Sequence, residues 1–355
     1  MATAHIGIPT LYPHVRNRAS GDTRRCNGGR RRSTIKTYLV RASTLDSNEI
    51  CGSCGYKEQK FKQLSWQSSD IGDGMTGYSP SYNLAPRDVT PCIVSGSHFK
   101  SKEKQVLHPM IWGMIPRWHK GDYRKHSMTT HNARSEGLLE SKLYSQPLTQ
   151  GQRCVILCEG YYEWKTKNKN KSDPKQPYFI YSKQNDGVEI QDRDTWKNEW
   201  SMENGWNGIK LLKLAGIFDS WLTVEKKKIY SCSMITTDAN NVLSWLHDRT
   251  PVFLETEKEI SDWLDDKSIP ATKAIKNLHG PTEDTLKWHP VDPAVNNSRF
   301  KSDTCYHPIK LEEKKKLAPS GLMASWLKTG RMSTDKKKSS DDDCSEPDVK
   351  RSKLM

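Results

Sequence analysis

Short apolar runs of strand length recur along the middle of this chain, and this feature most limits its fold. Gly, Pro and Asn, which favour turns, separate the runs. The runs are Cys92-Ile93-Val94, Cys154 to Cys158, Tyr178 to Tyr181, Leu212 to Ile217 and Ile229 to Ile235. None has the length of a membrane-spanning helix, so no membrane association is expected. The pattern predicts an α+β domain built around sheets.

Helical patterns are fewer. Glu257 to Leu264 carries three apolar residues at helical spacing. Asp238 is in position to cap a second helix that runs through Val242 to Leu246. The polar stretch from Ser182 to Gly208 interrupts the strands and is interpreted as a surface insertion.

Positive charge is concentrated at the two ends of the chain. The first 45 residues contain nine Lys and Arg against one Asp, which gives +8 of the total +14. Residues 311–355 contain eleven basic and eight acidic residues and add +3. The middle therefore keeps only +3, and any affinity for nucleic acid there must come from clustered basic side chains.

We predict a basic arm over residues 1–43, a domain over 44–310 and a disordered charged tail over 311–355. The arm is typical of an organelle transit peptide, a disordered segment or a wrongly assigned start of translation. Residues 320–328 of the tail contain an apolar island, Leu322 to Leu327, which is either chance or a docking motif, for example for a replication clamp. Lys336 to Lys338 and Lys350 to Lys353 are either solvated tail charges or nuclear-import patches, and we expect the nucleus over an organelle.

The nine cysteines form no framework that the sequence reveals. Their number is odd and no secretory signal precedes them, so a reducing compartment fits best. Cys51-Gly-Ser-Cys54 has the spacing of half a zinc or redox site, but no second pair of matching spacing follows. Cys154 and Cys158 lie in an apolar run and are interpreted as buried small hydrophobic residues. No metal or cofactor is expected.

The segment from Cys158 to Trp164, Cys-Glu-Gly-Tyr-Tyr-Glu-Trp, combines a carboxylate with aromatic residues. Strand alternation places Tyr161 and Glu163 on one face and Tyr162 and Trp164 on the other. Partial burial would raise the pKa of Glu163 and suit it to general acid/base catalysis near neutral pH. The alternative is an ordinary surface Glu beside a half-buried sheet.

Three further clusters offer polar or aromatic groups. His247 follows a predicted helix, where it either donates protons or caps the helix end. Asn132 and Arg134 supply amide and guanidinium donors within one turn, which suits phosphate or carbonyl oxygens and equally suits solvation. The stretch Trp112-Gly-Met-Ile-Pro-Arg-Trp118 places two tryptophans near Arg117, which suits either single-strand binding by base stacking or a core.

These stretches together resemble the SRAP (SOS-response-associated peptidase) family, in particular its eukaryotic abasic-site processing members. Nine motifs occur in family order between Asp46 and Ile309: Pro80-Ser-Tyr-Asn-Leu-Ala-Pro86, Trp112-Gly-Met-Ile-Pro-Arg-Trp118, Asn132-Ala-Arg134, Glu159-Gly-Tyr-Tyr-Glu-Trp164, Gln176-Pro-Tyr-Phe-Ile180, Leu214-Ala-Gly-Ile-Phe-Asp219, Ile235-Thr-Thr237, His247-Asp-Arg249 and Val295-Asn-Asn-Ser-Arg299. One motif would be weak, but nine in order make chance implausible.

The resemblance implies a β-barrel-like sheet core with surrounding helices and a groove for single-stranded DNA. In the family the initiator Met is removed, and the exposed cysteine attacks the ring-opened aldehyde of an abasic site. The α-amine forms a Schiff base and the thiol closes a stable thiazolidine. The implied activity is thus that of a self-processing peptidase with crosslinking and lyase-type chemistry on abasic single-stranded DNA. We expect a monomer.

The resemblance also implies a role for each site residue. Glu163 would be the general acid/base and support Met removal, and His247 would assist sugar-ring opening and the Schiff-base steps. Asn132 would orient the nucleophile or the sugar oxygen. The implied DNA contacts are Arg134 to phosphate, Trp112 against or between bases, and Arg117, Trp118, Asn297 and Arg299 along the groove.

One departure from the family concerns the nucleophile. The family start, Met-Cys-Gly-Arg followed by a short strand, should lie just before Thr44, where this chain has Thr37-Tyr-Leu-Val-Arg-Ala-Ser43. No cysteine occupies the register of the nucleophile, and Cys51-Gly52 lies too close to Tyr56 to replace the strand. Two hypotheses remain open: an active crosslinking protein whose first forty residues come from a mis-set start or unusual splicing, and a binding module that recognises damaged single-stranded DNA without covalent capture.

Overall fold

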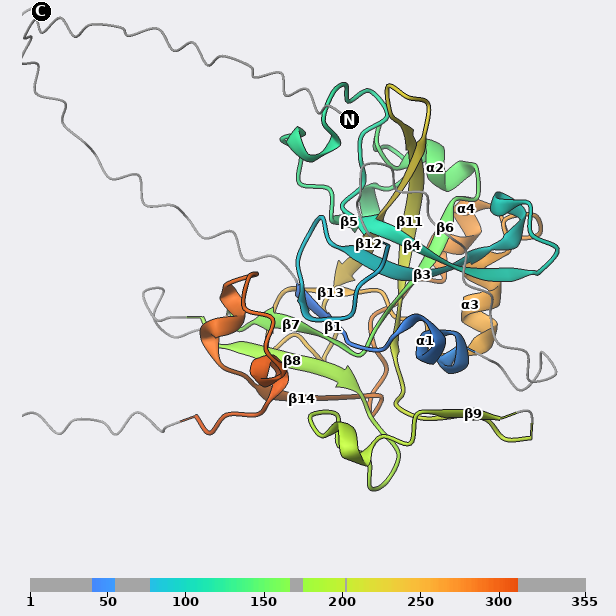
Figure 1. Cartoon of the computed structure of the whole chain (residues 1–355). Coiled ribbons are helices and arrows are strands. Elements are labelled where there is room, and N and C mark those ends of the chain that lie inside the picture. The colour runs from blue at the N-terminus through green and yellow to red at the C-terminus, as the bar shows by residue number, and fades with distance from the viewer. Residues whose placement is uncertain (1–39, 55–76, 167–174, 202, 312–355) are drawn as a thin grey trace, which may run out of the picture.

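The computed structural model describes residues 40–54, 77–166, 175–201 and 203–311. Most of the predicted basic arm, the charged tail with its apolar island, and the import patches lie outside these residues. Two sheets organise the described part of the chain (Figure 1), and they confirm the predicted α+β class with a barrel-like core. No helix among the described residues is long and apolar enough to cross a membrane.

The larger sheet closes into a five-stranded barrel because β11 pairs with both β6 and β12. Two short strands, β5 and β13, add to β12 outside the closed ring. The barrel strands are β3 (Val89–Ser95), β4 (Gln105–Trp112), β6 (Arg153–Cys158), β11 (Leu212–Leu222) and β12 (Lys228–Asp238), and the added strands are β5 (Asn132–Arg134) and β13 (Arg249–Pro251).

The smaller sheet has the strand order β14-β8-β7-β1-β2. Its members are β1 (Val40–Ser43), β2 (Ser81–Leu84), β7 (Gly160–Trp164), β8 (Pro177–Ser182) and β14 (Leu286–Pro290). All four residues of β1 are buried, and the strand pairs with both β7 and β2. We had assigned these four residues to the basic arm, and the structure instead places them in the interior of a sheet.

Within the described residues, four α-helices flank the sheets: α1 (Ser47–Ser53), α2 (Ser145–Thr149), α3 (Glu257–Leu264) and α4 (Ala271–Lys276). Helix α3 has the predicted bounds and begins with a capping box formed by Thr256 and Glu259. The helix predicted after Asp238 is wrong. Residues 241–246 form turns, because Asp238 ends β12 and Asn240 caps only a tight turn through its side chain. The 3-10 helices are η2 (Gly96–Phe99), η3 (Tyr123–Lys125), η4 (Ser135–Gly137), η5 (Arg193–Thr195), η6 (Pro293–Asn296) and η7 (Asp303–Tyr306).

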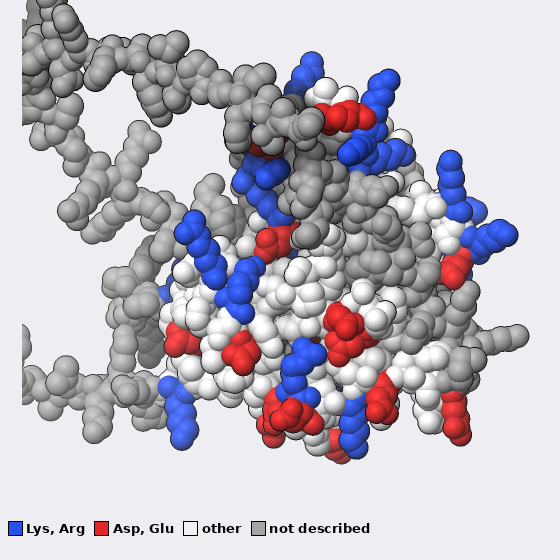
Figure 2. Space-filling model, in the orientation of Figure 1, with Lys and Arg blue, Asp and Glu red and all other residues white. Residues whose placement is uncertain are grey.

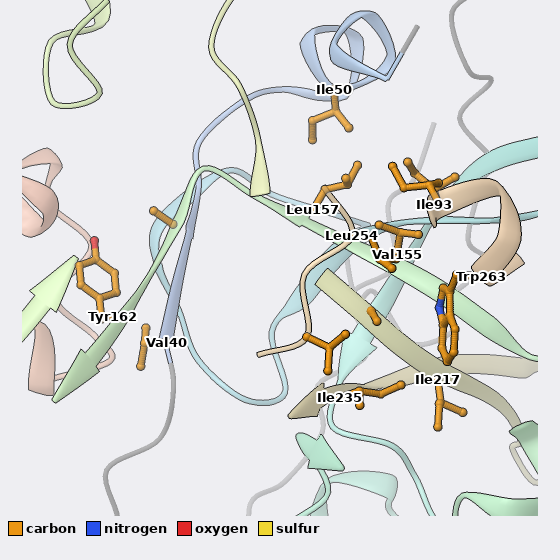
Figure 3. Packing of buried hydrophobic residues seen from close by; sticks show 14 of the residues in the cluster. Val40, Ile50, Ile93, Val155, Leu157, Tyr162, Ile217, Ile235, Leu254 and Trp263 are labelled. Atoms are coloured by element: carbon orange, nitrogen blue, oxygen red, sulfur yellow. The ribbon is translucent and has the colours of Figure 1, made fainter. Parts of the chain in front are cut away.

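The barrel wall has two apolar faces because side chains alternate along each strand. One face packs against the helices and the smaller sheet; Figure 3 shows Val155, Leu157 and Ile217 in this cluster with Trp263 of α3. The other face brings together residues from strands that are not neighbours, such as Cys92 and Cys232, whose sulfurs lie 3.9 Å apart. These residues therefore line the barrel interior.

The sequence indicated a surface position for the polar insertion, but part of the insertion is buried. It forms η5 and the hairpin of β9 (Glu199–Ser201) and β10 (Gly205–Asn207), and it buries Trp196 and Ile190 against the main core. Arg193 donates hydrogen bonds to the carbonyl and hydroxyl oxygens of Thr44 at 3.3 and 3.1 Å. The insertion therefore holds the corner where β1 turns into α1.

A buried histidine makes the stability of the barrel depend on pH. His108 is stacked on Phe99 with ring centroids 4.3 Å apart, and burial lowers its pKa to about 4. In the unfolded chain the same ring binds a proton near pH 6.5. The neutral buried ring therefore stabilises the fold above pH 6.5, and this contribution is lost as the pH falls to 4. As the pH falls from 7 to 4, we expect the free energy of unfolding of His108→Phe to rise by up to about 3 kcal/mol relative to that of the unchanged protein, measured by urea unfolding. A difference that does not vary with pH contradicts this.

Candidate active site

Strand β7 carries Glu163 into the interior. The predicted alternation is confirmed, since Tyr162 and Trp164 join the cluster shared with the helices and Tyr161 joins the barrel interior. Only 9% of Glu163 is exposed, and the Trp164 N–H donates a hydrogen bond of 3.0 Å to its Oε1. Burial raises the pKa of Glu163 to about 7, against the opposing effects of that hydrogen bond and of the Lys175 charge. The carboxyl therefore exchanges protons near neutral pH.

His247 lies in the connection between β12 and β13. Its Nδ1 accepts a hydrogen bond of 2.9 Å from the backbone N–H of Arg249. Burial lowers the pKa of His247, so the ring is neutral at pH 7 and carries its proton on Nε2. The connection is held in place because the Arg249 guanidinium donates to Glu136, at 2.8 Å, and to the carbonyl of Thr236, at 2.7 Å. The site thus has a fixed neutral N–H donor.

Asn132 and Arg134 lie on β5, which runs parallel to β12. Asn132 is opposite Met234 and Arg134 is opposite Thr236. The Asn132 Oδ1 atom is shielded from solvent and has no hydrogen-bond partner among the described residues. A shielded acceptor of this kind suits a hydroxyl or amine of a bound molecule. Arg134 is exposed at the end of the strand.

Backbone contacts bring these elements together. The N–H of Thr166, just beyond β7, donates a hydrogen bond of 3.0 Å to the carbonyl of Leu246, the residue before His247. The charge of Lys175 acts on both Glu163 and His247. Strands β5 and β13 both pair with β12, which connects Asn132 to the same region. A buried acid/base and a neutral N–H donor therefore lie near the end of β7, and the shielded acceptor lies on a strand that pairs with β12 beside β13.

Arg41, on β1, is a site residue that the sequence analysis missed. Its side chain is fully buried, and its guanidinium carbon lies 3.8 Å from the centroid of the Trp112 ring. None of its three side-chain nitrogens has a hydrogen-bond partner among the described residues. Burial lowers its pKa, which the thiols of the barrel interior oppose, Cys158 most strongly, and the charge of Arg41 in turn helps to lower the pKa of His131. The family start Met-Cys-Gly-Arg contains an arginine, and this was the sequence signal that could have identified Arg41. When that arginine is aligned with Arg41, Leu39 occupies the position of the cysteine.

The tryptophan cluster divides between core and surface. Trp112 is fully buried and its Nε1 donates a hydrogen bond of 2.9 Å to the carbonyl of His131, so it corresponds to the core alternative rather than to a solvent-facing base platform. Trp118 is 54% exposed. Arg117 forms a two-pronged ion pair with the buried carboxylate of Asp219, and its charge is therefore committed to the protein.

Asn297 and Arg299 are both exposed, in a loop beside β7. Asn83 of β2 fixes this loop because its Nδ2 contacts the carbonyls of Asn297, at 3.2 Å, and Phe300, at 2.9 Å. Asn296 in the same loop accepts a 2.6 Å hydrogen bond from the Trp164 indole. The loop thus packs on β7 through Trp164, whose side chain lies on the face of the strand opposite to that of Glu163.

Glu159 is a second residue whose role the sequence did not reveal. Both of its oxygens are buried and accept hydrogen bonds from the corner after β1: Oε1 from the N–H of Thr44 at 2.5 Å and of Leu45 at 2.9 Å, and Oε2 from the Thr44 hydroxyl at 2.8 Å. Burial raises its pKa, which these hydrogen bonds oppose. Glu159 therefore anchors the strand that precedes the corner.

Cys51 lies on α1 and Cys54 at its end. Burial raises the pKa of both thiols to about 11, so neither is an activated nucleophile. Within the described ranges, no group of three or more His, Cys, Asp or Glu side chains could hold a metal ion.

Known proteins resemble this chain over most of its length. The sequence model of the SOS response associated peptidase (SRAP) family matches residues 50–298. The abasic site processing protein HMCES of Rattus norvegicus is 35% identical over 297 residues, which cover 80% of each chain. HMCES of Xenopus tropicalis is 34% identical over 81% of this chain and 83% of its own. The abasic site processing protein YoqW of Bacillus subtilis is 30% identical over 63% of this chain and 84% of its own.

Solved structures share the fold. A crystal structure of a protein from Bacteroides thetaiotaomicron superposes with a TM-score of 0.52 at 19% identity, over 76% of this chain and 99% of that one. A protein from Bordetella bronchiseptica gives a TM-score of 0.50 at 18% identity, over 72% and 99%. The family model spans every described strand except β1 and includes Asn132, Glu163 and His247, and this chain belongs to the SOS response associated peptidase (SRAP) family.

Proposed function

We propose that this protein processes abasic sites in single-stranded DNA. The buried Glu163, whose pKa lies at about 7, is the observation that carries the proposal. An abasic sugar must exchange protons at its ring oxygen and at its aldehyde, and both steps need a group that is an acid and a base at the same pH. The names of the relatives, which call them abasic site processing proteins, support this substrate.

The residues around Glu163 fit the chemistry of an aldehyde and an amine. A neutral amine attacks the aldehyde carbon to give a carbinolamine, with one proton moved from the nitrogen to the oxygen. The hydroxyl then takes a second proton and leaves as water while the nitrogen loses its other proton, and an imine forms. Glu163 moves the protons, the Nε2–H of His247 supports the departing or ring oxygen, and Asn132 Oδ1 accepts from the sugar or the amine. When the amine belongs to an N-terminal cysteine, the thiol adds to the imine carbon and closes a thiazolidine. The same amine becomes available only after the initiator Met is removed, a step we also assign to Glu163.

The chain has Leu39 rather than cysteine at the position of the family nucleophile. We therefore propose two behaviours. A form that begins Met-Cys at this position captures abasic DNA covalently, whereas the chain with Leu39 recognises the damaged strand reversibly. One observation favours reversible binding by the chain with Leu39: Cys51 lies within α1, and its thiol has a pKa of about 11.

A gel assay with abasic single-stranded DNA separates the two behaviours. We expect the chain with Leu39 to shift the strand in a native gel and to release it on heating in denaturant. A version in which an initiator Met precedes Leu39→Cys is expected to give an adduct that survives heat and denaturant. An intact strand of the same sequence is the control. A heat-stable adduct of the chain with Leu39 refutes its reversible binding. Failure of both proteins to prefer the abasic strand refutes the proposed function.

A further inference from the structure

Three thiols that the proposed function does not use meet inside the barrel. This thiol cluster consists of Cys92 of β3, Cys154 of β6 and Cys232 of β12, and each of the three is fully buried. Strand β12 borders neither β3 nor β6, so Cys232 approaches the other two across the barrel interior. The Cys92 thiol donates a hydrogen bond of 3.9 Å to the Cys232 sulfur, and the Cys154 thiol donates a second one.

A glycine leaves room for the thiol cluster. Gly216 of β11 lies opposite Cys154 in the strand register. A Cβ atom at position 216 would lie 2.8 Å from the Cys154 sulfur, which is closer than Cβ atoms come to their neighbours in proteins. The space that a side chain would fill is therefore occupied by the sulfur, and the packing of the barrel holds the cluster in place.

A buried positive charge lies near the thiol cluster. On the face seen in Figure 2, Lys and Arg side chains project into solvent, whereas the Arg41 side chain is fully buried. None of its nitrogens has a hydrogen-bond partner among the described residues. The effect of burial on Arg41 is opposed by the charges of thiols, first Cys158 and then Cys232. Arginine keeps its proton in proteins, so a thiolate is the counter-charge that this interior can supply.

Cys232 is the thiol that these contacts ionise. The hydrogen bonds from Cys154 and Cys92 lower the pKa of Cys232, and the charge of Arg41 adds to their effect, against the effect of burial. Burial instead raises the pKa of both donor thiols, and it raises that of Cys158 to about 12. The thiolate is the nucleophilic form of cysteine. The cluster therefore places one nucleophilic sulfur in contact with a neutral thiol.

We propose that the thiol cluster is an oxidation site at which hydrogen peroxide joins Cys232 and Cys92 in a disulfide. The Cys232 thiolate attacks one peroxide oxygen, the O–O bond breaks, and the other oxygen leaves as hydroxide, which takes a proton from solvent. The Cys92 sulfur then attacks the sulfur of the resulting sulfenic acid, the S–O bond breaks, and the leaving hydroxide takes the Cys92 proton. One peroxide is thereby reduced to two waters, and the two cysteines together lose two electrons.

The geometry makes both steps feasible. The two sulfurs must approach from 3.9 Å to about 2 Å, a movement that side-chain rotation and small shifts of two strands can provide. Hydrogen peroxide is small and uncharged, so it can enter during the local openings that folded proteins undergo.

The test asks which cysteines react first. The unchanged protein is treated with hydrogen peroxide, its free thiols are blocked, and its disulfides are located by mass spectrometry of proteolytic fragments. Exposure alone favours Cys51, which is partly exposed and close in sequence to Cys54. We expect the Cys92–Cys232 disulfide to form at least about tenfold faster than a Cys51–Cys54 disulfide, because the pKa of both Cys51 and Cys54 is about 11. If the Cys51–Cys54 disulfide forms first, the proposal is wrong.

Two variants test the roles within the thiol cluster. Cys92→Ser with Cys154→Ser keeps a hydroxyl donor at each position but removes both thiols that could form a disulfide with Cys232. We expect it to accumulate the Cys232 sulfenic acid, which dimedone labels. Arg41→Met removes the positive charge and should slow oxidation of Cys232 by about tenfold or more.

The matched control is Cys305→Ser, at a buried cysteine outside the barrel interior, and it should leave the rate of Cys92–Cys232 formation within about twofold. Thermal unfolding of each variant verifies that it is folded, and dithiothreitol should restore the thiols of the unchanged protein. Absence of dimedone labelling at Cys232 in the folded serine variant, or an undiminished rate in folded Arg41→Met, would overturn the proposal.

Discussion

Glu163→Gln is expected to slow covalent capture of an abasic strand by a factor of about 10² to 10⁴. The change is tested in the version with an initiator Met before Leu39→Cys, by the rate at which a heat-stable adduct accumulates at saturating DNA. Glutamine keeps the size of the side chain and can still accept the hydrogen bond from the Trp164 N–H. It cannot take up or release a proton. The affinity for abasic DNA is expected to change less than threefold, because the loss concerns proton transfer rather than binding.

The pH dependence of the same reaction provides an independent measurement. Because burial raises the pKa of Glu163 to about 7, the rate with the unchanged side chain is expected to change its slope near pH 7. The residual rate of the glutamine variant should lack that inflection. Glu140→Gln, at an exposed position, serves as control and should retain both the rate and the inflection. A glutamine variant with an undiminished rate would exclude Glu163 as the acid/base.

The glutamine variant should also be more stable at high pH. The pKa of Glu163 rises from its ordinary 4.5 to about 7 on folding. The contribution of this carboxyl to the free energy of unfolding is therefore fully present below pH 4.5 and is lost as the pH rises through 7. At pH 8 the unchanged protein buries a carboxylate that glutamine replaces with a neutral group. We expect the variant to be more stable there by up to about 3 kcal/mol, with the difference vanishing near pH 4.5. Loss of activity together with gain of stability would show that the carboxyl is kept for function.

The strands and the orientation of Glu163 could be predicted because they follow from local pattern. Each apolar run lies in a strand, and alternation alone placed Tyr161 and Tyr162 on opposite faces of β7. Helix α3 was predictable for the same reason, since three apolar residues at helical spacing and a capping box agree. Sequence patterns specify such features because side-chain periodicity acts within one element.

The contacts between elements could not be predicted. Trp112 is covered by Arg41, which stacks on it from a strand about seventy residues earlier in the chain, whereas Trp118 in the same motif is exposed. Arg117 likewise forms an ion pair with Asp219, a residue about one hundred positions later in the chain. These residue types fit both a DNA interface and a protein interior, and only the tertiary partner decides between them. The signal available for Arg41 was its place in the family motif, whereas Glu159 had no local signal.

The corner that follows β1 yields the second large effect. Glu159→Ala is expected to lower the free energy of unfolding by about 3 kcal/mol or more, because it leaves the N–H groups of Thr44 and Leu45 buried without acceptors. Thr44→Val removes the hydroxyl, which donates to Glu159 and accepts from Arg193, but leaves both backbone N–H groups their acceptor, and should cost about 1 to 2 kcal/mol. Both are measured by urea unfolding at pH 7.

Glu159→Gln distinguishes a geometric role from a role of charge. Both backbone N–H groups donate to the same oxygen, Oε1, which glutamine retains, while the Thr44 hydroxyl can accept from the new amide. Glutamine is therefore expected to recover most of the stability that alanine loses. If glutamine costs as much as alanine, the anchor requires a carboxylate and the geometric account is wrong.

The same variants test whether the anchor serves catalysis. Strand β1 pairs Val40 with Tyr162, the neighbour of Glu163, so a displaced corner moves the start of the chain relative to the acid/base. In the version with Leu39→Cys after an initiator Met, Glu159→Ala should lower the capture rate at saturating DNA about tenfold or more, while affinity for abasic DNA changes little. Glutamine should restore the rate along with the stability. Full activity of a folded alanine variant would mean that Glu159 only stabilises the sheet, and that β1 finds its register without it.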